Sequence, residues 1–225
     1  MHHIDAVLLD VGGVFALPRH DDVAPVLEEF GVSIDPETHR RAHYAAMTAW
    51  DRTQDEDAWL ETYVAELGVP RERFDGRLED LGERLDVPWD GLVGGSVDGL
   101  RALADTGVAL AVVSNAEGHI EGWLRDNEVC KVGPGRGVRV AAVVDSTVVG
   151  IWKPDPRIFE IALVATASAP GRSMYVGDTV TLDVAGARAA GMHPVHFDPY
   201  DLCEQRDDHE HVKSLHEVAR LVSGD

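Results

Sequence analysis

The sequence predicts an α/β fold: a doubly wound parallel sheet flanked by helices, with a small all-helical insertion. Two observations support this prediction. Short apolar runs that end abruptly in polar residues recur along the chain and alternate with helical patterns, and one long helical stretch interrupts the alternation near the N-terminus. The 225 residues are enough for one core domain and a modest insertion. Strands that alternate with helices of this length favour right-handed crossovers between parallel strands.

The first strand is expected over residues 4–9, a short apolar and partly β-branched run. The run ends at Asp10, and Gly12 and Gly13 then permit a sharp turn. The strand therefore places Asp10 at its C-terminal end.

A helical insertion is expected between residues 18 and 88. Apolar residues there recur at helical spacing, namely Val23, Val26, Leu27 and Phe30 and later Trp59, Tyr63 and Leu67. The stops between helices are supplied by Gly31, Gly68 and Pro70.

Beyond the insertion, strands and helices alternate to the end of the sequence. The expected strands cover residues 108–113, 138–144, 173–176 and 194–197. The expected helices cover residues 97–105, 156–167, 182–190 and 212–222. A glycine-rich loop is expected at residues 133–137.

The charge balance argues against nucleic acid and membrane partners. The chain has 20 Lys and Arg against 40 Asp and Glu, a formal net charge of -20, which repels phosphate backbones and anionic lipid surfaces. Divalent cations suit this balance. No apolar run near the N-terminus is long enough for a signal peptide or a membrane span.

The cysteines and histidines suggest neither a disulfide framework nor a zinc site. Two cysteines, Cys130 and Cys203, are too few for a disulfide scaffold, so we expect a reducing, cytoplasmic location. No histidine pair has a convincing zinc-site spacing with supporting cysteines. We therefore expect solvated histidines, including His193, His196, His209, His211 and His216.

The residues at the strand ends carry the candidate chemistry, because ligands bind open parallel sheets at the carboxyl ends of the strands. The set comprises Asp10, Ser114, Asn115, Asp178 and Asp183, together with Lys153 just ahead of an expected helix. Carboxylates, a hydroxyl and a cation are what phosphoryl transfer requires.

Each residue type in this set suits one part of that reaction. Asp10 and Asp178 offer the carboxylate oxygens that Mg²⁺ prefers. Lys153 and Ser114 can hold the charge of a phosphoryl group. A carboxylate can also attack phosphorus and form an acyl phosphate that water hydrolyses, and Asp10 is our candidate for this nucleophile.

Four segments in this order resemble the motifs of the haloacid dehalogenase superfamily: Asp10-Val11-Gly12-Gly13-Val14, Val112-Val113-Ser114-Asn115, Lys153-Pro154-Asp155-Pro156, and Gly177-Asp178 with Asp183. The resemblance spans nearly the whole chain. It implies a Rossmann-like catalytic core over residues 1–16 and 92–225. It also implies a helical cap over residues 17–91 that closes over the substrate and sets specificity.

The resemblance further implies roles for the motif residues. Asp10 is the implied nucleophile, and the phosphate is bound by Ser114, Asn115 and Lys153. The implied metal is Mg²⁺, with ligands from Asp10, the backbone carbonyl of Gly12, Asp178 and Asp183, the last as a ligand or a neighbouring group.

One position departs from the family pattern. Phosphatases of this type usually carry a second Asp two residues after the nucleophile as general acid and base, and here that position is Gly12. A missing general acid costs about 10² to 10⁴ in rate, so we expect easier leaving groups, such as those of anomeric sugar, aryl or acyl phosphates. Alternatively His20, Asp21 or Asp22 folds back as a substitute acid.

We therefore expect a Mg²⁺-dependent hydrolase of small phosphorylated metabolites, with a sugar phosphate as one candidate, that works through an aspartyl phosphate. Two alternatives stay open: a 2-haloacid dehalogenase-type hydrolase, and a catalytically silent binding or regulatory protein that lost its acid at Gly12. Both a monomer and a homodimer are compatible with the sequence.

Overall fold

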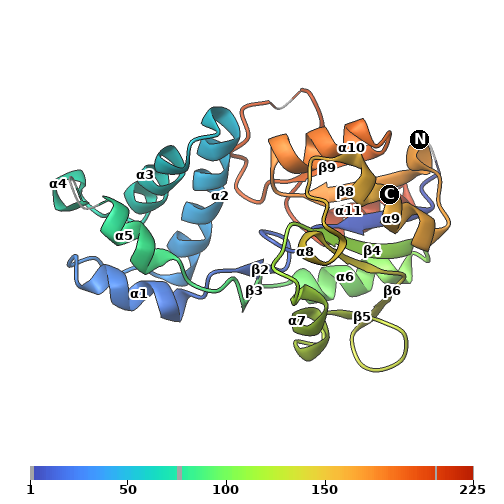
Figure 1. Ribbon diagram of the computed structural model, residues 1–225, viewed down its shortest axis with the longest axis horizontal. Helices are drawn as coiled ribbons and strands as arrows, with labels where there is room; N and C mark the ends of the chain where they lie inside the picture. The colour runs from blue at the N-terminus through green and yellow to red at the C-terminus, as the bar shows by residue number, and fades with distance from the viewer. Residues whose placement is uncertain (1–2, 75–77, 206, 225) are drawn as a thin grey trace. The chain divides into compact units, whose positions relative to one another are not determined.

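The computed structural model describes residues 3–74, 78–205 and 207–224 and divides into two compact units (Figure 1). The core unit comprises Met1–Phe15 and Gly94–Asp225, and the helical unit comprises Ala16–Val93. In the described part of the chain, no helix combines the length and the apolar character needed to cross a membrane.

The core unit is built on a six-stranded sheet in the order β10-β9-β8-β1-β4-β7. All five strand pairs are parallel. The strands are β1 (Ala6–Leu9), β4 (Ala109–Ser114), β7 (Val143–Asp145), β8 (Ser173–Gly177), β9 (His193–Phe197) and β10 (Glu210–Val212). Helices flank this sheet, so the expected Rossmann-like α/β core is confirmed.

Strand β1 lies in the middle of the sheet and aligns the strand ends. Leu9 pairs with Val112 of β4 on one side and with Val176 of β8 on the other. The C-terminal ends of the three strands therefore meet at one edge. All four β1 residues are fully buried, and since successive side chains point to opposite faces, both faces of the sheet are covered.

Two groups of helices pack on the core sheet. Helices α9 (Pro156–Thr166) and α10 (Ala185–Ala189) contribute to one apolar cluster with β1, β4 and β8, in which Phe159 packs edge-on against Tyr175. Helix α6 (Ser96–Asp105) packs closely on α11 (Leu215–Ser223), where a Cβ at Gly99 would lie only 2.7 Å from Leu215.

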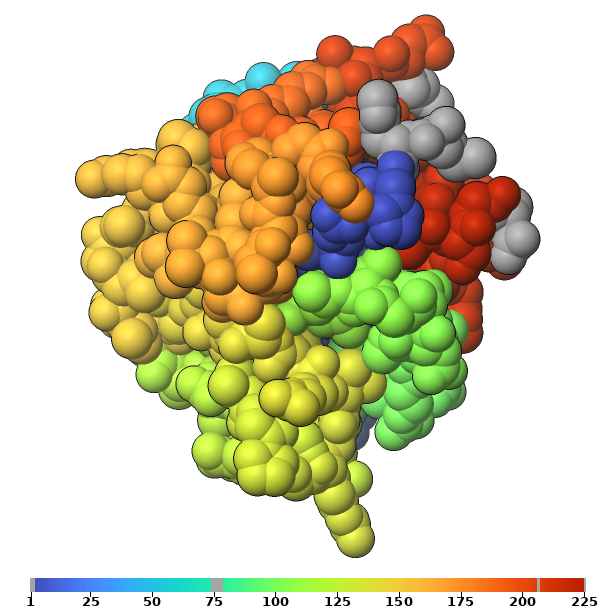
Figure 2. All heavy atoms as spheres, turned by 90° about the vertical axis from the view of Figure 1, so that its right-hand side faces the viewer, coloured from blue at the N-terminus to red at the C-terminus, as the bar shows by residue number. Residues whose placement is uncertain are grey.

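The N-terminal edge of the sheet is held by Asp5. Its backbone N–H donates to Arg172, its carboxylate pairs with the Arg172 side chain at 2.6 Å, and its carbonyl accepts from Ala109. Figure 2 shows the blue N-terminal segment at the surface, between orange and green parts of the chain. This edge is opposite the one where Asp10 emerges.

Three expected elements differ from the observed ones. The run 138–144 forms two strands: β6 (Val138–Val140) pairs with β5 (Cys130–Val132) in a small separate sheet, and β7 joins the main sheet. Alongside β4, the alanines between β6 and β7 bond to its backbone, through Ala141 N–H to Leu110 and through the Ala142 carbonyl to Val112. The expected loop at residues 133–137 is confirmed.

The expected helices near residues 182 and 212 also begin differently. A π-helical turn, η2 (Val180–Val184), precedes α10. The chain forms strand β10 where the last helix was expected to start, and α11 begins only at Leu215 because Ser214 caps it by accepting from Glu217 N–H. The core unit also contains α7 (Ile120–Asp126) and α8 (Ser146–Val149), which have no counterpart in the expected elements.

The helical unit contains α1 (His20–Glu28), α2 (Pro36–Thr53), α3 (Glu56–Glu66), α4 (Arg71–Phe74) and α5 (Leu78–Leu85), with a short antiparallel pair of β2 (Ala16–Leu17) and β3 (Gly91–Leu92). Asp35 starts α2 by accepting from the N–H groups of Glu37 and Thr38, as an N-cap does. The core of this unit includes the fully buried Leu27, Val64 and Leu81.

A buried histidine lies in this unit. His43 is 1% exposed and contacts Trp89 and Tyr44 edge-on, at ring distances of 4.9 and 5.2 Å. Burial lowers the pKa of His43 from 6.5 to about 3. Burial also lowers the pKa of His39 to about 4. Both rings are therefore neutral at neutral pH.

We predict that burial of the neutral His43 destabilises the folded protein as the pH falls below 6.5. Between pH 6.5 and about 3 the unfolded chain binds the His43 proton and the folded unit does not, so this window costs on the order of 1 kcal/mol per pH unit. The effect is absent above pH 6.5. Thermal unfolding followed by circular dichroism across the window, for wild type and His43→Phe, measures it. The variant should have the shallower slope, and equal slopes would contradict the prediction.

Candidate active site

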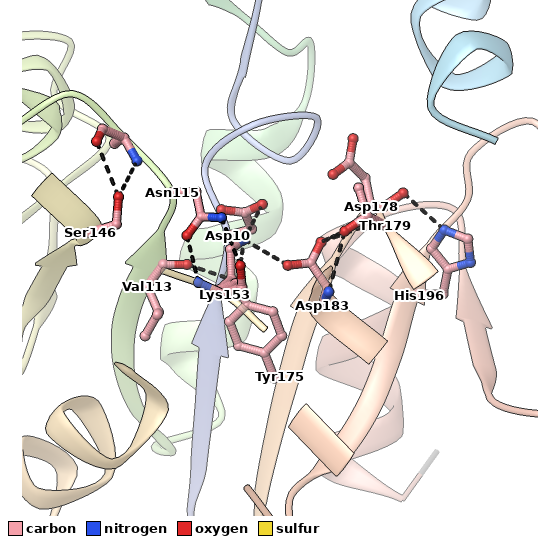
Figure 3. Close-up of polar contacts among 11 residues, drawn as sticks. Asp10, Val113, Asn115, Ser146, Lys153, Tyr175, Asp178, Thr179, Asp183 and His196 are labelled. Carbon is pink, nitrogen blue, oxygen red and sulfur yellow. Dashed lines mark hydrogen bonds and ion pairs between the residues drawn. The ribbon is translucent and has the colours of Figure 1, made fainter. Parts of the chain in front are cut away.

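Asp10 occupies the position directly after β1. Its backbone N–H donates to Val176 of β8 at 2.9 Å, and the residue is 6% exposed. The Nζ of Lys153 lies 2.8 Å from Asp10 Oδ2 and 2.6 Å from Asp183 Oδ1 (Figure 3). The structure thus brings together the first and third motifs and the carboxylate that follows the fourth.

Asn115 holds the backbone of Lys153. Its side-chain oxygen accepts from Lys153 N–H at 2.8 Å, and its side-chain amide donates to the Lys153 carbonyl at 3.2 Å. The Lys153-Pro154 peptide bond between this clamp and α9 is cis. Both polar ends of the Asn115 side chain are therefore engaged in positioning Lys153.

The hydroxyl of Tyr175 contacts the ammonium group of Lys153, a role that the sequence did not reveal. This β8 residue is 1% exposed, accepts from Lys153 Nζ at 3.0 Å and donates to the Val113 carbonyl at 2.8 Å. Within an apolar strand pattern, a tyrosine is indistinguishable from a core residue. Because Tyr175 lies two residues before Gly177, both residues are expected on the same face of the strand, but this spacing gives no sign of a polar role.

Asp183 is satisfied at both oxygens. Oδ1 accepts from Lys153, while Oδ2 accepts from the N–H and the hydroxyl of Thr179 at 2.9 and 2.7 Å. Thr179 also caps η2, the turn that carries Asp183. Thr179 was missed as well, although the spacing of four residues in Thr179–Asp183 is a signal for such a local bond.

Asp178 completes a cluster of carboxylates. Asp10, Asp178 and Asp183 are all buried and each offers an oxygen within 4.8 Å of the others. Gly13, with φ of +67°, makes room for this approach, because a Cβ there would lie 1.9 Å from Asp178 Oδ2. The Asp178 carbonyl lies 3.1 Å from His196 Nε2.

Burial and charge act against each other at this site. Burial raises the pKa of Asp10 to about 7, because desolvation and repulsion from Asp183 and Asp178 outweigh the attraction of Lys153. Although burial opposes its charge, the carboxylates of Asp10 and Asp183 raise the pKa of Lys153 above its ordinary value. Burial also raises the pKa of Tyr175. Lys153 is thus charged and Tyr175 neutral at neutral pH.

Two expected site residues, Ser114 and Gly12, have defined positions near the strand ends. None of the contacts described for them joins them to Lys153 or to the three carboxylates. Ser114 ends β4, two residues beyond the partner of Leu9, and is 4% exposed. Gly12 lies in the turn after Asp10, and its carbonyl accepts from Val14 N–H at 2.7 Å. A carbonyl oxygen has a second lone pair, so this bond leaves one for another partner.

Comparison with known families agrees with this arrangement. Residues 4–191 match the model of the haloacid dehalogenase-like hydrolase family. This chain belongs to that family. The order and placement of the four motifs therefore reflect family membership, and the expected resemblance is confirmed.

The curated relatives match only part of this chain. A phosphoserine phosphatase of Thermus thermophilus is 40% identical over 92 residues, 41% of this chain and 34% of that protein. The chain spans about a third of the length of the curated relatives it matches.

Solved structures share the fold at low identity. A haloacid dehalogenase family hydrolase from Deinococcus radiodurans, with bound phosphate and sodium, has a TM-score of 0.60 at 22% identity over 100% of this chain and 97% of its own. A 2-haloacid dehalogenase from Pseudomonas syringae has a TM-score of 0.55 at 18% identity over 98% and 99%. At these identities the likeness shows the fold alone.

We predict that Gly13→Ala displaces Asp178, because the added Cβ would overlap its carboxylate. Gly95→Ala is the matched control: Gly95 has φ of +80°, and its added Cβ meets no described atom within 4 Å. Both variants should lose about 1 to 2 kcal/mol of unfolding free energy through backbone strain. Gly13→Ala alone should lose unfolding free energy beyond this amount. It alone should also lose any rise in melting temperature that Mg²⁺ produces in the wild type. Identical urea unfolding curves and Mg²⁺ responses would contradict this.

Proposed function

We propose that this protein is a Mg²⁺-dependent phosphate-ester hydrolase that acts on small phosphorylated metabolites through an aspartyl phosphate on Asp10. The observation that carries the proposal is a buried group of three carboxylates, Asp10, Asp178 and Asp183, whose oxygens lie within 4.8 Å of one another. Lys153 pairs with Asp10 and Asp183, and the group lies at the carboxyl ends of adjoining parallel strands. Ligands bind open parallel sheets at this edge.

The residues present fit a divalent cation. Asp10 Oδ1 is buried and has no hydrogen-bond partner among the described residues. When all three carboxylates are ionised, Lys153 balances only one of their charges. Asp10, Asp178 and the carbonyl of Gly12 are the oxygen ligands that Mg²⁺ prefers. Asp183, already bonded at both oxygens, is better suited to positioning Lys153 than to direct coordination.

The covalent chemistry is assigned to Asp10. Its Oδ2, beside Lys153, attacks phosphorus as the bond from phosphorus to the ester oxygen breaks. The leaving oxygen takes that electron pair and a proton from solvent, since Gly12 has no side chain to donate one. Water then attacks the phosphorus, releases inorganic phosphate and regenerates the carboxylate. When bound, Mg²⁺ supplies positive charge to the phosphoryl oxygens.

The other residues hold the charge in place. Lys153 lies close enough to Asp10 Oδ2 to contact the phosphoryl oxygens during transfer. Asn115 and Tyr175 position Lys153 through the bonds described above. Ser114 is proposed as a further phosphate ligand from the end of β4. By the same family resemblance, the helical unit is proposed to act as a cap over the substrate.

The carboxylate cluster favours phosphate over the alternatives. A 2-haloacid dehalogenase uses the same Asp nucleophile without a metal, so it has no need for Asp178 beside Asp10 and Asp183. A silent binding protein has no need for a nucleophile paired with a buried lysine. Among the substitute acids, Asp22 pairs with Arg19 at 2.8 Å, which lowers the pKa of Asp22 and makes it a poor proton donor.

We predict that phosphate release from p-nitrophenyl phosphate requires Mg²⁺ and Asp10. Asp10→Asn removes the nucleophilic carboxylate and should abolish turnover while the protein stays folded by circular dichroism. Asp105→Asn makes the same charge change at an exposed position of the core unit and should retain full activity. Release that survives chelator, or survives Asp10→Asn, would refute the proposed mechanism.

The missing acid predicts a preference among esters. Glucose 1-phosphate should be hydrolysed faster than glucose 6-phosphate, because its leaving group has less need of a proton. Gly12 is not among the glycines with positive φ, so a side chain there avoids left-handed backbone strain. Gly12→Asp should raise kcat for glucose 6-phosphate by about 10² to 10⁴. Equal wild-type turnover of both sugar phosphates would count against the leaving-group argument.

A further inference from the structure

A second cluster of metal-binding side chains lies in the core unit, at the edge of the sheet formed by β9 and β10. His196 belongs to β9, His211 to β10, and Cys203 and His209 to the connection between them. Each offers one ligand atom, and all four atoms lie within 4.8 Å of one another. The expectation that these histidines are solvated is wrong for His196, which is 5% exposed, and for His209, whose side chain is fully buried.

Two distances within the cluster are close to the edges of a tetrahedral site. His209 Nε2 lies 3.2 Å from His196 Nδ1 and 3.8 Å from Cys203 Sγ. With bonds of about 2.1 Å to nitrogen and about 2.3 Å to sulfur, a tetrahedral zinc site has edges of about 3.4 Å between nitrogens and about 3.6 Å between nitrogen and sulfur. His211 stacks on His209 with ring centroids 4.5 Å apart, which brings the fourth ligand to the same point.

The remaining ring nitrogens have the partners that zinc-bound histidines use. His196 Nε2 lies 3.1 Å from the Asp178 carbonyl, and His209 Nδ1 lies 3.4 Å from a carboxylate oxygen of Asp208. Such contacts fix the ring orientation and leave the other nitrogen for the metal. Both ring nitrogens of His211 are buried and have no hydrogen-bond partner among the described residues, although Nδ1 lies 3.5 Å from a carboxylate oxygen of Asp198.

The connection between β9 and β10 is shaped to present the cysteine. Asp198, directly after β9, accepts from Leu202 N–H at 2.8 Å and from Cys203 N–H at 3.1 Å. Its own N–H donates to Val212 of β10.

We propose that His196, Cys203, His209 and His211 bind one Zn²⁺ ion in a closed four-coordinate site. Three imidazoles and a thiolate suit zinc, whereas the carboxylate cluster suits a hard cation. Four protein ligands leave no open position, so the ion is structural. It ties the β9–β10 connection to the sheet and, through His196, holds the backbone at Asp178. Zinc binding here does not depend on the proposed hydrolase activity.

The test measures zinc directly in untagged full-length protein. After desalting in excess Mg²⁺, which occupies the carboxylates, mass spectrometry of the metal should find one zinc per chain. Replacement by Co²⁺ should give a thiolate-to-cobalt charge-transfer band, a signal that oxygen ligands cannot produce. Protein that retains no zinc and shows no such band with Co²⁺ would overturn the proposal, and this measurement needs no variant.

Variants then assign the ligands. Cys203→Ser should abolish the charge-transfer band. His211→Ala should weaken zinc binding by more than about 10-fold, because loss of a residue that only hydrogen-bonds to a ligand already costs about 10-fold or more. Cys130→Ser and His216→Ala are the controls, since Cys130 lies in β5 and His216 is exposed on α11. Both controls should keep one zinc per chain. A charge-transfer band that persists in Cys203→Ser and disappears in Cys130→Ser would overturn the assignment.

Discussion

The rest of the site depends on the buried ion pairs that the ammonium group of Lys153 forms. The ammonium lies between the carboxylates of Asp10 and Asp183 with a side chain only 2% exposed. Removal of one partner from such a group leaves an uncompensated buried charge, at a cost of about 3 to 5 kcal/mol. The surrounding contacts therefore hold every member: Asn115 fixes the lysine backbone and Thr179 fixes Asp183. Sheet register does the same for Asp10.

The core unit contains two chemically different clusters that meet at the backbone of Asp178. Oxygen ligands gather around Asp10 and Asp178, and nitrogen and sulfur ligands gather around His209. The contact between His196 and the Asp178 carbonyl joins them. A hard cation and a soft one would each select its own cluster, so the two sites need not compete although they share the Asp178 backbone as a neighbour.

The fold and the centre of the site could be predicted because both follow from periodic patterns. Apolar runs that end in Asp10 and Asp178 define parallel strands, and parallel strands deliver their ends to one edge. Tyr175 escaped prediction because its polar role depends on a partner far away in sequence. The histidine and cysteine cluster escaped because its spacing follows no local rule: a three-residue edge strand, β10, returns His211 beside His196.

The position of β1 also has a consequence for synthesis. This N-terminal strand is the middle strand of the sheet, and its partners lie at Ala109–Val112 and Ser173–Val176. At about 5 to 20 residues per second, the ribosome needs on the order of 10 s or more to produce β8 after β1 has emerged. The continuous helical unit, Ala16–Val93, is complete long before then. The strand that precedes Asp10 is thus made before both of its partners, so the nascent chain must keep an apolar β-strand from premature association until β4 and β8 can pair with it.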